Sequence, residues 1–111
     1  MAETRPAPAT YAQIRQAIST LQATSFEVAN RRGLVDGSSP VDAELGRLAI
    51  DIGPAIKCIG MGRDGKNELA RRLANIVLRA CTTAQLAGVD LSGAVVARVQ
   101  ENAASAAKAR R

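Results

Sequence analysis

The chain has 111 residues and a formal net charge of +5, and 47% of its residues are hydrophobic but only 2% are aromatic. It contains no histidine, which excludes Ser-His-Asp and Cys-His catalysis within one chain and removes the commonest transition-metal ligand. The length indicates one domain, and the lack of an 18-residue apolar run or a signal-peptide pattern predicts a cytoplasmic protein without membrane contact.

The first part of the chain predicts one long helix. Residues 1–9 are rich in proline and alanine and are expected to form a flexible segment. A helix is predicted over residues 11–32, with Thr10 as its N-cap and Gly33 as its left-handed stop. Its larger apolar residues share one helical face and are Ile14, Ile18, Leu21 and Val28.

The second predicted helix spans residues 40–52, with Ser39 as its N-cap. The pair Gly53-Pro54 should stop or kink it, because proline lacks the backbone donor and clashes with the preceding turn. The stretch GMGRDG that follows resembles a phosphate-binding loop superficially. It lacks the Lys-Ser/Thr pair and follows no predicted strand, so it is interpreted as an irregular, flexible turn.

Two further helices are predicted in the C-terminal half. The third covers residues 66–86 and ends at Gly88, and the fourth covers residues 91–107 and is capped by Asp90 or Ser92. The third helix follows the same apolar spacing of three and four residues as the second, and the larger apolar residues of the fourth are Val95, Val96 and Val99.

Residues 10–107 are therefore expected to form a single all-α domain resembling a four-helix bundle, followed by a basic tail over residues 108–111. Alanine is abundant and contributes little buried area, so the core should be thin for the length of the chain. We expect this core to be completed by homo-oligomerisation.

Residues 40–88 predict a helical hairpin with apolar stripes and a polar seam. The stripes comprise Val41, Leu45, Leu48 and Ile52 on one helix and Leu69, Leu73, Ile76, Val77 and Ala80 on the other. With the turn near residue 60, the seam residues pair as Glu44 with Asn75, Arg47 with Arg72, and Asp51 with Glu68.

Over residues 41–102, the order ELGRLA, a Gly-containing connection, ELARRLANIVLRA and AGVDL resembles the MazG-like, all-α nucleoside triphosphate pyrophosphatase superfamily. In that family, an E-E-x-x-E motif and an E-x-x-D motif hold the magnesium that helps cut the triphosphate. The matching positions here are Ala43, Glu44 and Arg47, then Arg72 and Asn75. Magnesium prefers carboxylate oxygens, and only one remains, so the resemblance implies a member that has lost catalysis.

The resemblance implies a non-catalytic protein, without a resident cofactor, that binds a nucleotide or related phosphorylated ligand between the second and third helices. Guanidinium groups bind phosphate bidentately, so the candidate ligand-binding residues are Glu44, Arg47, Arg72 and Asn75, with Asp51, Glu68 and Arg79 secondary. The structural alternative is an ion-pair ladder, with Arg47 bound to Asp51 and Arg72 bound to Glu68.

Two other functions stay open at this point. An active, magnesium-dependent pyrophosphohydrolase would use a rearranged carboxylate cluster of Glu44, Asp51 and Glu68. A module that binds protein or nucleic acid would use a basic surface of Arg63, Lys66, Arg71 and Arg79. Stacking aromatics are scarce, so the signal for nucleic-acid binding is weak. Cys58 and Cys81 are expected several turns apart, too far for a disulfide, and are interpreted as packing or interface thiols.

Overall fold

The structure is a computed structural model that describes residues 7–109. Its elements are α1 (Pro8–Arg31), α2 (Val41–Lys57), the single-turn 3₁₀ helix η1 (Cys58–Gly60), α3 (Gly62–Ala87) and α4 (Leu91–Ala109). No strand occurs in this part of the chain, so the all-α prediction is confirmed. None of these helices is both long and apolar enough to cross a membrane.

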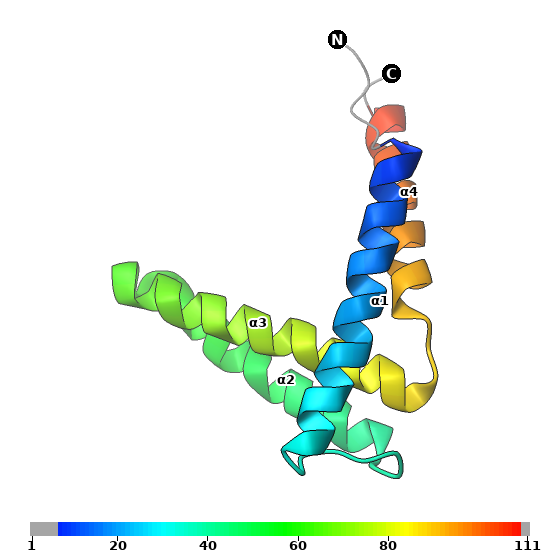
Figure 1. Cartoon of the computed structure of the whole chain (residues 1–111). Coiled ribbons are helices and arrows are strands. Elements are labelled where there is room, and N and C mark those ends of the chain that lie inside the picture. Colours follow the sequence, from blue (N-terminus) through cyan, green and yellow to red (C-terminus); the bar gives the residue numbers. More distant parts are fainter. Residues whose placement is uncertain (1–6, 110–111) are drawn as a thin grey trace.

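The four helices form two arms that meet at an angle (Figure 1). α2 and α3 pack antiparallel as a hairpin, and α1 packs against α4 in the other arm while crossing the C-terminal half of α3. The radius of gyration is 16.7 Å, compared with about 13 Å for a compact domain of this length. The chain is therefore open, and each arm is only two helices thick.

The buried apolar side chains are few and mostly small, as the alanine-rich composition predicts. They are Val35, Ala55, Cys58, Cys81, Ala84 and Val96. Both thiols are free and buried, and burial raises the pKa of Cys81. The cysteines thus act as packing residues within the chain.

Of the two outcomes predicted for Gly53-Pro54, a stop or a kink, the stop is excluded, because α2 continues through both residues. Proline at this position removes the helical hydrogen bond to the carbonyl of Ile50. The Ile50 residue is 71% exposed, so water can satisfy that carbonyl. Beyond the proline, Ala55 and Cys58 are buried, and their burial favours continuation of the helix.

The glycine-rich stretch after α2 is more helical than predicted. α3 begins at Gly62, so most of GMGRDG belongs to a helix and not to a flexible turn. Gly65 lies inside this helix, where a Cβ atom would come within 2.5 Å of the carbonyl oxygen of Cys58. Glycine at this position therefore permits the close approach of η1 to the first turn of α3.

Local hydrogen bonds set the other helix ends. Ser39 does not cap α2 as predicted, because its hydroxyl accepts a hydrogen bond from the backbone N–H of Asp36 at 2.9 Å. Gly88 ends α3 in the left-handed conformation, with φ of 69°, as predicted. Asp90 caps α4, since its Oδ1 accepts from the backbone N–H of Gly93 at 3.1 Å.

α1 begins at Pro8 and so includes Thr10, which the sequence pattern places just before the helix. Of the expected flexible segment, residues 1–6 lie outside the described part of the chain. The same holds for residues 110–111 of the expected basic tail, whereas Lys108 belongs to α4.

One side-chain amide ties the two arms together where they meet. Gln22 of α1 donates from Nε2 to the carbonyl oxygen of Val89 at 3.0 Å and to Oε1 of Gln85 at 3.1 Å. Its Oε1 accepts from the backbone N–H of Leu91 at 3.3 Å. The amide therefore fixes α1 against the α3–α4 connection and helps to set the angle between the arms.

Replacing this amide by an apolar side chain of similar size should weaken the junction. We expect Gln22→Met to lower the free energy of unfolding by about 1–2 kcal/mol, because the three hydrogen bonds of this amide to α3 and the α3–α4 connection are lost. Urea denaturation measures the change. Gln13→Met, at an exposed position of the same helix, is the control, and equal free energies for the two variants would contradict this role.

Candidate functional site

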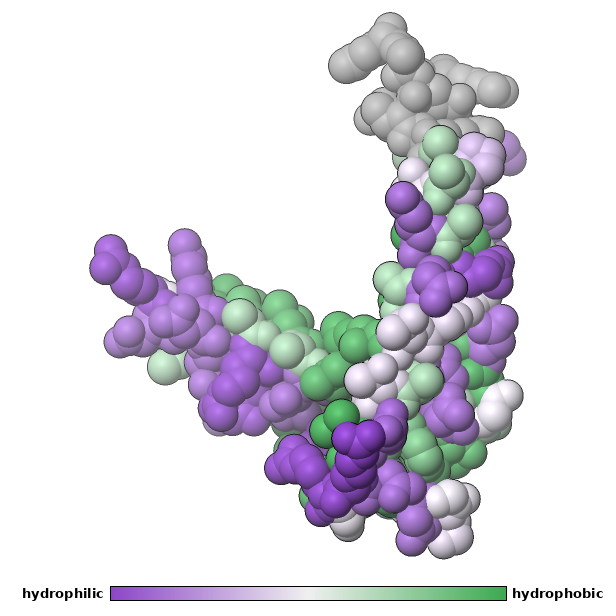
Figure 2. Space-filling model, viewed as in Figure 1, coloured by the Kyte–Doolittle hydropathy of each residue, from purple (hydrophilic) through white to green (hydrophobic). Residues whose placement is uncertain are grey.

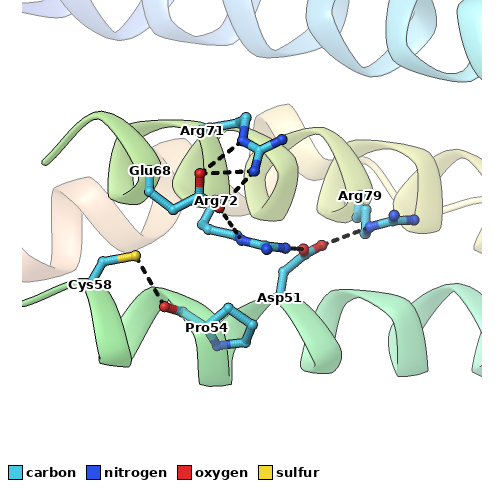
Figure 3. A network of polar contacts seen from close by, with 7 residues as sticks. All are labelled: Asp51, Pro54, Cys58, Glu68, Arg71, Arg72 and Arg79. Carbon is cyan, nitrogen blue, oxygen red and sulfur yellow. Dashed lines mark hydrogen bonds and ion pairs between the residues drawn. The ribbon is translucent and has the colours of Figure 1, made fainter. Parts of the chain in front are cut away.

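Six polar side chains predicted to form the seam lie along the facing sides of α2 and α3, and Arg79 joins them by pairing with Asp51. The set is Glu44, Arg47, Asp51, Glu68, Arg72, Asn75 and Arg79, and we keep the name seam for it. Figure 3 shows Asp51 of α2 reaching towards two arginines of α3. The structure thus confirms that polar side chains meet between these helices.

Asp51 is the centre of the seam. It is 5% exposed, and its Oδ1 accepts from Nη1 of Arg72 at 3.3 Å while its Oδ2 accepts from Nε of Arg79 at 2.9 Å. Arg72 also donates from Nε to Oε1 of Glu68 at 3.0 Å, as the ion-pair ladder predicts. Hydrogen bonding from Arg71 lowers the pKa of Glu68, so this carboxylate stays ionised at neutral pH.

The predicted register of the hairpin is wrong in its details. Asp51 pairs with Arg72 and Arg79 and does not lie opposite Glu68, and Arg47 pairs with Glu44 on its own helix and not with Asp51. Arg72 and Arg79 are seven residues apart, about two turns of α3, and both reach Asp51, so Asp51 lies at a level between them (Figure 3). The observed register is therefore shifted along α3 relative to the predicted one.

A cavity of about 400 Å³ opens beside the seam. It lies between α1, the connection to α2 and one side of the α2/α3 hairpin, and not only between the second and third helices. Its polar lining comes from Arg32, Glu44, Arg47, Asn75, Arg79 and Thr82, and its apolar lining includes Leu21, Val28, Leu34, Val35 and Leu78. We call this cavity the pocket.

Three of the four primary candidates line the pocket, namely Glu44, Arg47 and Asn75, together with the secondary candidate Arg79. Arg72 does not line it, because Asp51 and Glu68 hold its guanidinium on the seam. Its predicted role in ligand binding is therefore not supported by its position.

Arg32 is a pocket residue that the sequence pattern does not reveal. It follows the last residue of α1, where a basic residue is already explained by the negative end of the helix dipole. No carboxylate among residues 7–109 forms an ion pair with it. Only the packing of α1 across α3 brings this guanidinium beside the hairpin.

The electrostatics of the pocket favour an anion. Three arginines line it and Glu44 is the one carboxylate among its lining residues. Glu44 is 3% exposed and pairs with Arg47, and Asp51 pairs with Arg79, so Arg32 is the pocket arginine that has no ion-pair partner among the described residues. Ser25 adds a buried hydroxyl oxygen that has no hydrogen-bond partner within the described residues.

The side chains present do not fit the magnesium ion that members of the resembled family bind. Within residues 7–109, no three carboxylate, cysteine or histidine side chains lie close enough together to hold a metal. The carboxylates of the proposed cluster, Glu44, Asp51 and Glu68, each face an arginine. A divalent cation would have to displace these guanidinium groups to bind.

The predicted basic surface is not assembled either. Arg79 points into the seam and Arg71 is paired with Glu68 through both Nε and Nη2. Arg63 and Lys66 are exposed near the start of α3. These two cations alone are a weaker basis for a nucleic-acid interface than the four that the sequence predicts.

Neutralising Asp51 should destabilise the hairpin, because Arg72 and Arg79 would lose their shared counterion. We expect Asp51→Asn to lower the free energy of unfolding by about 2–3 kcal/mol, less than for a fully buried pair because both arginines are partly exposed. Glu101→Gln is the matched control, since it neutralises an exposed pair with Arg98 and should change the free energy by about 0.5 kcal/mol or less. Equal losses in thermal or urea unfolding would contradict the central position of Asp51.

The chain matches no protein-family model, no curated protein and no solved structure. What the pocket binds therefore has to be inferred from its own residues.

Proposed function

We propose that this protein is a degenerate, non-catalytic MazG-like protein that binds a nucleotide or a related phosphorylated small molecule in the pocket. The observation that carries the proposal is a cavity of about 400 Å³ lined by Arg32, Arg47 and Arg79 together with several aliphatic side chains. Cavities of this size hold small-molecule ligands. A nucleotide has both parts that such a cavity requires, a charged phosphate and a flat, weakly polar ring system.

The ion pairs of the seam position these arginines without using up their donors. A guanidinium carries five N–H donors. Arg79 gives only its Nε to Asp51, and Arg47 gives Nη1 to Glu44. Both retain N–H groups for a phosphate, so the ion-pair ladder and the anion site are compatible, and the carboxylates act as positioning residues.

The apolar side chains that line the pocket favour a ligand with a ring system over inorganic phosphate. Val28, Leu34 and Leu78 line the pocket and are between 42% and 53% exposed. Covering such side chains with a ligand removes apolar surface from water, which is favourable. Asn75 and the unpartnered hydroxyl of Ser25 add hydrogen-bonding groups beside this surface.

Several wider features agree with the proposal. The antiparallel hairpin with a seam of polar residues supports the MazG-like assignment, and the arginines opposite each carboxylate support the loss of metal-dependent catalysis. The open shape supports homo-oligomerisation. Free thiols at Cys58 and Cys81 are consistent with a reducing, cytoplasmic setting.

Thermal unfolding in the presence of nucleoside mono-, di- and triphosphates tests the function. A ligand at about 100 times its dissociation constant should add about 2.7 kcal/mol of stability, a shift of many degrees for a domain of this size. We expect the shift to survive EDTA, because arginines and not a metal ion bind the phosphate. No shift with any nucleotide would contradict the proposal, and a magnesium-dependent shift with pyrophosphate release would replace it by the enzyme.

The residues are tested by a matched pair of substitutions. Arg47→Gln should weaken nucleotide binding about tenfold or more, since one charge-assisted contact to phosphate is lost. Arg98→Gln is the control, because Arg98 also pairs with a carboxylate three residues away on its own helix but lies on α4, outside the pocket. Titration calorimetry separates the two, and equal affinities would remove Arg47 from the site.

A further inference from the structure

The large exposed apolar side chains of this chain fall mainly into two groups. Val28, Leu34 and Leu78 line the pocket. A second group belongs to α2, η1, α3 and the turn between them, does not line the pocket, and is between 43% and 75% exposed. It comprises Leu45, Ile52, Ile56, Ile59, Met61, Leu73 and Val77, and we call it the hairpin face.

The α2 residues of the hairpin face have a fixed relation to the seam. Leu45 follows Glu44, and Ile52 follows Asp51, so each exposed apolar residue comes directly after a buried residue of the contact with α3. Ile56 and Ile59 follow the buried Ala55 and Cys58 in the same way. One residue corresponds to about 100° of rotation, so the stripe lies beside the seam on one side of α2.

α3 repeats this relation. Leu73 follows Arg72, and the half-buried Leu69 and Ile76 follow Glu68 and Asn75. Because α2 and α3 are antiparallel, the same rotation on each helix brings both stripes to the same side of the hairpin. The pocket lies on the other side. Figure 2 shows hydrophobic residues along the upper edge of the α2/α3 arm and hydrophilic residues on the surface below it.

Two glycines accompany the hairpin face. Gly46 and Gly53 lie inside α2, each directly after a residue of the stripe, and a Cβ atom at either would meet nothing within 4 Å. Glycine inside a helix is destabilising relative to alanine, and nothing within residues 7–109 uses the space that these two leave. A second helix packed closely on this face would use it.

The exposed area fits a second copy of the chain. The chain exposes 7733 Å², whereas a compact monomer of 11.6 kDa would expose about 5,800 Å². The excess of about 1,900 Å² is larger than the ~800 Å² that each partner buries in a standard interface. On α2, the stripe residues and the small residues beside them form a strip without a charged residue, as in obligate interfaces. The strip comprises Leu45, Ile52, Ile56, Gly46, Ala49 and Gly53.

We infer that the hairpin face binds the same face of a second copy across a two-fold axis, so that two α2/α3 hairpins form one four-helix bundle with both pockets on its outside. A two-fold contact uses one surface of both subunits, which an apolar and uncharged face satisfies without complementary charges. The proposal specifies the homo-oligomerisation stated above and is independent of ligand binding.

Sedimentation equilibrium with a matched pair of variants tests this interface. The wild-type chain should sediment as a dimer, with twice the 11.6 kDa mass of the chain. Ile52→Lys should weaken association about 100-fold or more, because it puts a charge into an apolar contact. Ile50→Lys is the control: Ile50 is more exposed than Ile52, 71% against 43%, but lies off the stripe, and its variant should remain within about threefold of wild type.

Gentler variants keep the test valid if a lysine prevents folding. Ile52→Ala and Ile50→Ala both introduce a strong helix former, and only the first should weaken the dimer, by about tenfold. A monomeric wild type would overturn both the interface and the oligomer. A dimer in which the substitutions at both positions have equal effects would overturn this interface alone. Either result leaves the nucleotide titration of the pocket as a separate question.

Discussion

The contact of Asp51 with two arginines is the interaction on which the rest of this structure depends. It links α2 to α3 in a part of the hairpin where few large apolar side chains are buried, and it fixes the direction of the Arg79 side chain. A buried ion pair adds little net stability compared with an apolar contact, but breaking one is costly. Here the contact mainly sets the geometry, since Asp51 holds the guanidinium of Arg72 on the seam and presents that of Arg79 to the pocket.

The hairpin built on this contact has two unlike sides. One side carries Arg47, Asn75 and Arg79 and is covered by α1, which adds Arg32 and an aliphatic wall. The other side carries large aliphatic residues that no part of the described chain covers. A two-helix hairpin of this kind cannot enclose its own apolar surface, and this explains why the chain is open and its core thin.

Much of this arrangement can be predicted from the sequence, for identifiable reasons. Apolar spacing and glycine stops predict four helices, and the left-handed Gly88 lies where its chemistry predicts. The seam residues follow from their shared helical faces. The continuation of α2 through Pro54 was not predictable, because it depends on burial beyond the proline and on an exposed carbonyl before it.

The pocket could be predicted only in part, because its second wall depends on tertiary packing. Glu44, Arg47 and Asn75 were found from their positions on two adjacent helices. Arg32 was not, because a basic residue at a helix end has a sufficient local explanation. Arg72 does not line the pocket, because Asp51 and Glu68 hold its guanidinium on the seam.

The most direct measurement of the central claim is NMR of the arginine Nε–H groups during titration with a nucleotide that stabilises the protein, in the presence of EDTA. The account predicts that the signals of Arg32, Arg47 and Arg79 move together and saturate, whereas that of Arg72 changes little because Asp51 and Glu68 already hold it. Equal changes at Arg72 and at exposed arginines such as Arg98, or no change at the three pocket arginines, would contradict it.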